Sequence, residues 1–218
     1  MSIASSIGNN LTTNGVFTAS AVNNTSVNNV TDFASVPSGG VLKLISEQTA
    51  SSSATIDFTS GINSTYDSYV FKFINIHPST DGDGSLTFQA NASGGSGFNE
   101  TMTTTYFRAY HTESDGTATL LYDASKDIAQ GTSYQILSAN IGGDNDECGS
   151  GTLQIFNPSS TTFVKHFICS ASTYHSNSAA RNDFSAGYFN TTSAIDEISF
   201  KMDVGNIDSG TIKMYGVG

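Results

Sequence analysis

Two short acidic segments carry the side chains best suited to bind a metal ion. Asp81-Gly-Asp-Gly84 and Asp144-Asn-Asp-Glu147 alternate carboxylates with glycine or asparagine. Ca²⁺ prefers such oxygen ligands. Neither segment continues into the glutamate that completes an EF-hand loop, so a solvated turn is the simpler interpretation of each. The calcium candidates are Asp81, Asp83, Asp144 and Asp146.

The histidines and cysteines do not follow the spacings of metal or nucleophile motifs. Four histidines are spread along the chain: His77, His111, His166 and His175. We expect structural roles for them. Cys148 and Cys169 are interpreted as two free thiols, and a cross-strand disulfide stays an alternative that spacing cannot decide.

Known catalytic motifs are missing from the sequence. It contains no Gly-x-Ser-x-Gly elbow and no phosphate-binding loop. A glycosidase would need two carboxylates facing each other across a cleft, and the sequence does not single out such a pair. We therefore expect no enzymatic activity and no cofactor. A glycan-degrading appendage enzyme is the alternative from another functional class.

The charge composition excludes nucleic-acid binding. The net charge is −11, with 8 Lys and Arg residues against 19 Asp and Glu residues, whereas phosphate backbones require clustered cations. The chain begins without a basic leader, and no apolar run reaches the ~18 residues of a membrane span. We expect neither a secretion signal nor membrane insertion.

The closing segment, Ile195–Gly218, shows the strand pattern most clearly. Apolar Ile198, Phe200, Met202 and Val204 alternate with polar residues, which is typical of a strand with one buried face. Comparable segments recur between turn-forming residues at 41–45, 54–58, 69–76, 86–90, 103–111, 120–122, 134–141, 151–156, 163–171 and 185–190. This spacing predicts an all-β, jelly-roll-like antiparallel β-sandwich of about ten strands over residues 40–218.

Residues 1–39 differ from the rest of the chain. They are rich in Asn, Thr, Ser and Ala, with isolated apolar side chains. A disordered leader is one interpretation. The apolar residues favour an extended N-terminal arm that anchors the protein to a partner. Its candidate anchoring residues are Ile3, Ile7, Leu11, Phe17 and Phe33.

The segment 69–76 is apolar on both faces of the expected strand. Tyr69, Phe71 and Phe73 lie on one face, and Val70, Ile74 and Ile76 lie on the other. A strand with two apolar faces is either central or covered by another subunit. We therefore predict that Tyr69, Phe71 and Phe73 contribute to an oligomer interface, with a homotrimer as the expected state.

Three segments resemble a known family. They are Tyr-Asp-x-Tyr at Tyr66–Tyr69, Asn-Pro-Ser at Asn157–Ser159, and Gly-Thr-Ile-Lys-Met-Tyr-Gly at Gly210–Gly216. The chain from Val41 onward is similar to small β-sandwich virion structural proteins of tailed phages of marine bacteria. Members of that family are labelled tail-fibre, head-decoration or virion structural proteins. The resemblance implies no catalytic residues.

The resemblance implies a structural role on the exterior of a virion. We expect a tail-fibre-like surface appendage subunit, anchored by its N-terminal arm to other virion proteins. Such a subunit would contact a host surface receptor or glycan. The alternative within this class is a capsid decoration protein bound at lattice threefolds.

Overall fold

The computed structural model describes residues 42–80 and 84–218. These described residues form an all-β fold, with twelve antiparallel strands in a nearly closed, barrel-like sheet. The strands are β1 (Lys43–Thr49), β2 (Ile56–Phe58), β3 (Ser68–Pro78), β4 (Gly84–Ala92), β5 (Met102–Thr112), β6 (Ala118–Tyr122), β7 (Gln135–Ile141), β8 (Gly149–Phe156), β9 (Lys165–His175), β10 (Ala179–Phe189), β11 (Ile195–Met202) and β12 (Ile207–Val217). The sequence had predicted about ten.

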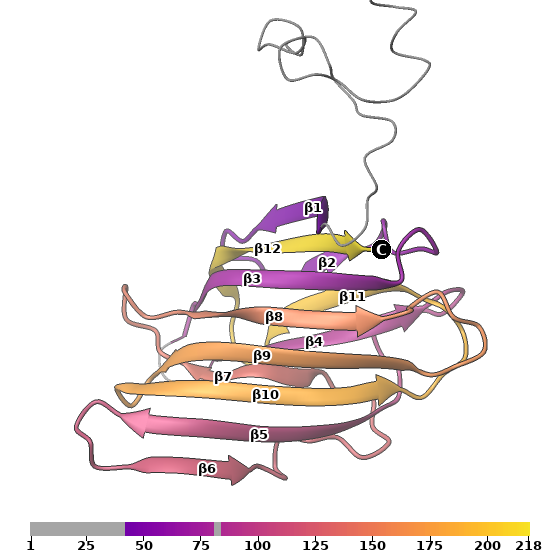
Figure 1. Cartoon of the computed structure of the whole chain (residues 1–218). Coiled ribbons are helices and arrows are strands. Elements are labelled where there is room, and N and C mark those ends of the chain that lie inside the picture. The colour runs from indigo at the N-terminus through magenta and orange to yellow at the C-terminus, as the bar shows by residue number, and fades with distance from the viewer. Residues whose placement is uncertain (1–41, 81–83) are drawn as a thin grey trace, which may run out of the picture. The chain divides into compact units, whose positions relative to one another are not determined.

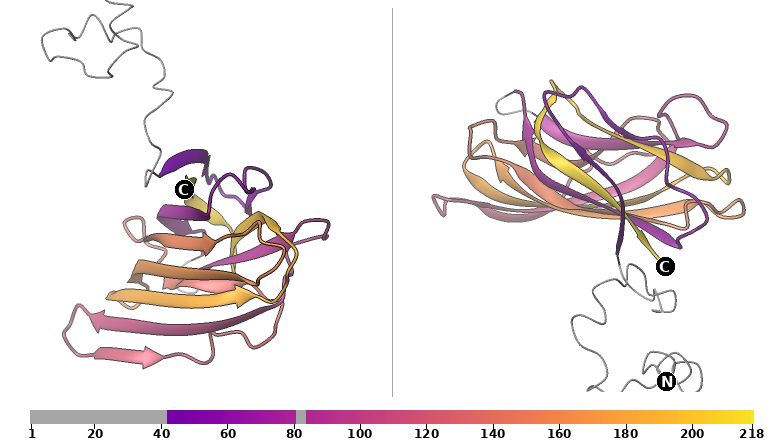
Figure 2. Two further views of the ribbon diagram at one scale, coloured as in Figure 1. Left: turned by 45° about the vertical axis from the view of Figure 1, so that its right-hand side comes forward. Right: turned by 90° about the horizontal axis from the view of Figure 1, so that it is seen from above.

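The strands form two layers. The larger has the order β1-β12-β3-β8-β9-β10-β5-β6, and the smaller has the order β7-β4-β11-β2. A single residue pair, Ile141 with His175, links β7 to β9 and joins the layers. Figure 1 shows the larger layer in front of the smaller one, and the view from above in Figure 2 shows both layers curving around a common interior.

The pairing between distant strands is nested. β1 pairs with β12, β2 with β11, β3 with β8, and β4 with β7. Two hairpins are added to this plan, β5–β6 and β9–β10, and β10 pairs with β5. These hairpins extend the larger layer beyond β8, so that β5 and β6 lie at its end (Figure 1).

The core between the layers is aromatic. Phe200 on β11 lies 5.5 Å from Phe71 on β3, 6.1 Å from Phe58 on β2 and 6.4 Å from Phe88 on β4, measured between ring centroids. All four rings are almost completely buried. Tilted and edge-to-face contacts of this kind add to the stabilisation from apolar burial. The alternation predicted for the closing segment therefore places its apolar face against the opposite layer.

Strand β3 corrects the predicted oligomer interface. Tyr69, Phe71 and Phe73 are 0% exposed because they lie in the chain's own hydrophobic core, and they offer no surface to another subunit. The other face is not uniformly apolar or buried. Asn75 has a φ of 52°, the strand register shifts there, and Ile76 joins the inner face while Ile74 stays 39% exposed. Such a bulge breaks the alternation that the sequence pattern assumed.

The hairpin β9–β10 is longer than predicted. The sequence indicated strands at 163–171 and 185–190, whereas the strands are Lys165–His175 and Ala179–Phe189. The first half of β10 escaped detection because its inward positions hold Arg181 and Asp183 instead of apolar side chains. An inward charged pair of this kind gives no alternating apolar pattern.

The arm prediction lies outside the described residues. All five candidate anchoring residues are among those left undescribed: Ile3, Ile7, Leu11, Phe17 and Phe33. The described strands belong to the unit Gly39–Gly218. In this part of the chain, no helix is long and apolar enough to cross a membrane.

Candidate functional site

A buried ion pair connects the two layers near their link. Arg181 and Asp183 both point inward from β10, and the Arg181 Nε atom donates to Asp183 Oδ1 over 2.7 Å. Arg181 Nη2 also donates to the Tyr106 hydroxyl over 3.0 Å. The second Asp183 oxygen accepts a hydrogen bond from the Ala139 amide of β7 over 2.8 Å. The carboxylate thus joins β10 of the larger layer to the edge strand of the smaller one.

The protonation states at this pair suit a structural role. Burial alone would lower the pKa of Arg181, but the charge of Asp183 and the contact with Tyr106 raise it above its ordinary value. Burial raises the pKa of the Tyr106 hydroxyl far above its usual range. The arginine therefore stays charged and the tyrosine stays neutral. A buried pair with these partners holds strands together and has no free group for chemistry.

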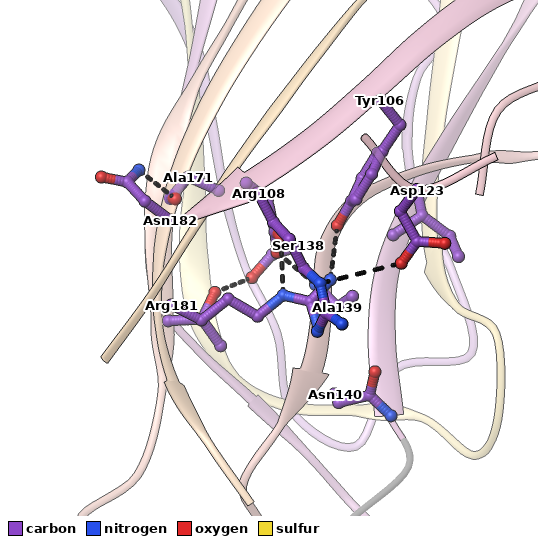
Figure 3. Close-up of polar contacts among 12 residues, drawn as sticks. Tyr106, Arg108, Asp123, Ser138, Ala139, Asn140, Ala171, Arg181 and Asn182 are labelled. Carbon is purple, nitrogen blue, oxygen red and sulfur yellow. Dashed lines mark hydrogen bonds and ion pairs between the residues drawn. The ribbon is translucent and has the colours of Figure 1, made fainter. Parts of the chain in front are cut away.

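A second arginine nearby has far fewer partners. Arg108 on β5 lies beside the buried pair, and Figure 3 shows it with Tyr106, Arg181 and Asp123. Its Nε atom is 3.8 Å from Asp123 Oδ2, and its guanidinium lies 5.7 Å from the centroid of the Tyr110 ring. Among the described residues, Nε is buried without a hydrogen-bond partner. The side chain of Arg108 is 26% exposed.

Arg108 lines an open hollow of about 450 Å³ at the end of the larger layer. Its lining residues are Arg108, Tyr110, Thr117, Thr119, Leu120, Leu121, His175 and Asn177. Strand register explains the arrangement, because Arg108 is opposite Leu121 and Tyr110 is opposite Thr119, so that all four share one face of β5–β6. The hollow combines a cation, an aromatic ring and neutral polar groups.

His175 forms an uncharged wall of this hollow. It is 7% exposed, and its ring lies edge-on to Tyr110 at 5.3 Å between centroids. Burial, together with the nearby charges of Arg181 and Arg108, lowers the pKa of His175 to about 4. The backbone amide of Asn177 donates a hydrogen bond to His175 Nδ1 over 3.1 Å, which requires that nitrogen to be unprotonated. At neutral pH the cationic group of the hollow is therefore Arg108.

The acidic turns show no metal cluster in the part of the chain that is described. Asp144 and Asp146 lie in the turn before β8, where the Glu147 carboxylate accepts a hydrogen bond from the Asp144 amide. No group of three or more His, Cys, Asp or Glu side chains within residues 42–80 and 84–218 is placed to hold a metal ion. Asp81 and Asp83 lie outside the described residues.

Both cysteines are free thiols. Cys169 on β9 is buried, and burial raises the pKa of its thiol far above the usual range. Cys148 is partly exposed, and its Sγ lies 3.8 Å from the Asn75 side-chain oxygen. The cross-strand disulfide that the sequence left open is not formed.

The three segments that carry the family resemblance meet at one junction. Gly216 on β12 pairs with Tyr69 on β3, and the ring of Tyr66 covers Gly216 so closely that a Cβ atom there would overlap it. The backbone amide of Asn157 donates to the backbone carbonyl oxygen of Asp67 over 2.7 Å. Gly216 and Tyr66 therefore have a packing role at this junction, because the close contact leaves no room for a Cβ atom.

Sequence reasoning did not single out Arg108, Arg181 or Asp183. One signal was available, because the chain contains two arginines and each has a polar or aromatic residue two positions later. On a strand, i and i+2 share a face. That spacing pairs Arg181 with Asp183 and Arg108 with Tyr110. What the sequence could not show is the direction in which each face points.

No protein-family model, curated protein or solved structure matches this chain.

Proposed function

We propose that this chain is a structural subunit on the exterior of a tailed-phage particle, in a tail-fibre-like appendage that contacts the host. The observation that carries the proposal is the nested pairing of β1 with β12, β2 with β11, β3 with β8 and β4 with β7. We infer that this is a jelly-roll-like sandwich, the two-layer architecture of many viral and lectin domains. The sequence resemblance to virion proteins supports the same class of function.

The surface composition fits such a role. Only 12% of residues are charged, against about 25% in typical soluble domains, and the surface is instead rich in Ser, Thr, Asn and Gly. Adaptable binding surfaces use such neutral polar residues together with tyrosine.

Residues 1–39 are proposed as the attachment to other virion proteins. A homotrimer stays part of the proposal, without Tyr69, Phe71 and Phe73 at its interface.

Location and copy number in purified virions test the proposal. We expect antibody labelling or electron cryo-microscopy to find the chain on an appendage, with a quantitative gel giving a copy number that matches the fibres. A copy number that matches the capsid lattice would support the decoration protein instead. Complete absence of the chain from virions would overturn both.

A truncation tests the attachment role. Removal of residues 1–40 should leave a folded domain, checked by circular dichroism and thermal melting, that no longer joins the particle. Normal incorporation of the truncated chain would contradict the arm hypothesis. Sedimentation of the full chain over a range of concentrations tests the trimer, and a monomer throughout would remove it.

A further inference from the structure

We propose that the hollow beside Arg108 binds the carboxylate of an acidic sugar. The Arg108 guanidinium is poorly satisfied, since its partners in the described residues are one carboxylate at 3.8 Å and the Tyr110 ring. An arginine has five N–H donors in a planar arrangement that matches a carboxylate in bidentate fashion. This arginine therefore has donor capacity that the chain itself does not use.

The other arginine of the chain has a very different environment. Arg181 is buried and donates to both Asp183 and Tyr106 at 2.7 and 3.0 Å. Arg108 lies one strand away on β5, and its side chain is 26% exposed in an open hollow. The net charge of −11 repels anions at a distance. At short range, however, a partly exposed and weakly paired guanidinium attracts an anionic group.

The rest of the hollow suits a sugar better than a bare inorganic anion. The Tyr110 ring and the Leu121 side chain supply apolar surface for the face of a pyranose ring, and Thr119 and Asn177 supply neutral donors and acceptors for hydroxyl groups. The volume of about 450 Å³ lies in the usual range for small-molecule sites. A phosphate or sulfate ion would use the arginine and leave most of this lining without contacts.

Asp123 provides an internal competitor for the arginine. Burial alone would raise the pKa of Asp123, but hydrogen bonds from Ser125 and the charges of Lys126 and Arg108 bring it below its ordinary value. The carboxylate is thus ionised and partly neutralises Arg108 in the free protein. An incoming carboxylate would share the guanidinium with it or replace it.

This inference rests on the proposed function only for the source of the ligand, which would be an acidic glycan of the host surface. The binding itself is tested with the purified full-length chain. The probe is a glucuronate-containing oligosaccharide, and the matched control is the same oligosaccharide after reduction of its carboxyl groups. Titration calorimetry or amide chemical shifts report binding.

We expect the acidic oligosaccharide to bind and its carboxyl-reduced form to bind at least about tenfold more weakly, as expected for loss of a hydrogen-bonded charge pair. Arg108→Gln should weaken binding by a similar factor, and Arg108→Lys should weaken it less. Asp123→Asn should strengthen binding, because it removes the competing carboxylate. Lys201→Gln is the matched control, since Lys201 lies 4.2 Å above the Tyr134 ring outside the hollow. It should leave binding unchanged.

Several results would overturn the inference. The acidic and the carboxyl-reduced oligosaccharide could bind equally well. An Arg108→Gln variant with unchanged thermal melting could bind as tightly as the wild type. Inorganic phosphate could displace the oligosaccharide at equal concentration. Failure of binding would remove this site while leaving the virion location to be decided by labelling. Conversely, binding by a chain that is absent from virions would overturn the proposed function and leave the site standing.

Discussion

The carboxylate of Asp183 on β10 accepts a hydrogen bond from the Ala139 amide of β7 over 2.8 Å. The same carboxylate also binds Arg181, and the pair lies where the two layers approach each other, near the link between Ile141 and His175. β7 and β10 do not form a ladder with each other, and this side chain joins them directly. A fully buried carboxylate thus adds to the backbone link between β7 and β9.

Replacing this carboxylate should strongly destabilise the protein. Asp183→Asn leaves the Arg181 cation buried without a counter-charge, and we expect a loss of about 3–5 kcal/mol in the free energy of unfolding. Urea denaturation measures it. The matched control is Asp115→Asn, since Asp115 pairs with His111 at 2.9 Å on the surface and its side chain is 90% exposed. That change should cost less than about 0.5 kcal/mol.

A double replacement separates an unpaired charge from a lost contact. Arg181→Met combined with Asp183→Leu removes both charges, and we expect it to be less destabilised than Asp183→Asn alone. Urea denaturation of both variants makes the comparison. If the double variant were the less stable of the two, the cost would come from packing or from the Ala139 hydrogen bond, and not from the unpaired Arg181 charge.

Gly216 should not tolerate a side chain. A Cβ atom there would overlap the Tyr66 ring, which packs edge-on to Tyr69 at 5.8 Å between centroids. We expect Gly216→Ala to cost about 1–3 kcal/mol, the usual range for overpacking, in thermal or urea unfolding. The same change at Gly116 is the control, because its nearest neighbours are flexible hydroxyl side chains at the surface. An equal loss at both positions would show that the Tyr66 contact is not the cause.

His175 should make the fold sensitive to mild acid. Its pKa is about 4 in the folded protein, whereas an unfolded histidine titrates near 6.5. The unfolded state then binds more protons between these values, so stability falls as pH falls from about 6.5 to about 4. The shift corresponds to a loss of about 3 kcal/mol. Denaturation of the wild type and His175→Gln across this range measures it.

The comparison with the variant isolates the histidine from titrating carboxylates. We expect the stability of the wild type relative to His175→Gln to decline over that pH range and to level off on either side. His111→Gln is the control, because the His111 side chain is 57% exposed. Parallel curves for the wild type and His175→Gln would show that His175 titrates alike in both states.

The two thiols should differ in reactivity. Thiol reagents attack the thiolate, and burial both shields Cys169 and raises the pKa of its thiol. We expect a chromogenic disulfide reagent to modify Cys148 in the native protein and both cysteines after denaturation. Cys148→Ser should abolish the fast native reaction. A native chain in which Cys169 reacts as fast as Cys148 would contradict the burial of β9.

Much of the fold could be predicted from local patterns. The period-two alternation of Ile198, Phe200, Met202 and Val204 predicted a strand with one buried face. Ile198, Phe200 and Met202 are buried, whereas Val204 lies beyond the end of β11 and is 48% exposed. The all-β class follows from the same alternation repeated between turns. Strand boundaries failed where inward positions were polar, as at Arg181 and Asp183 on β10.

The candidate site was less predictable because its parts are brought together by non-local pairing. Arg108 and Tyr110 come from β5, and His175 and Asn177 come from the end of β9 and the turn after it. Their proximity depends on β10 pairing with both β5 and β9. Such pairing is not encoded in any short segment.

The sequence by itself determined that this chain forms strands, where most of them lie and which of their faces are apolar, because alternation and turn residues act over a few positions. Only the tertiary structure decided which strands pair, how the Asn75 bulge brings Ile76 into the core, and which cation stays accessible. The physical reason is that a polar side chain such as Asp183 can be buried only if partners from distant strands satisfy it. Arg108 has no such set of partners among the described residues, and only the assembled layers show that.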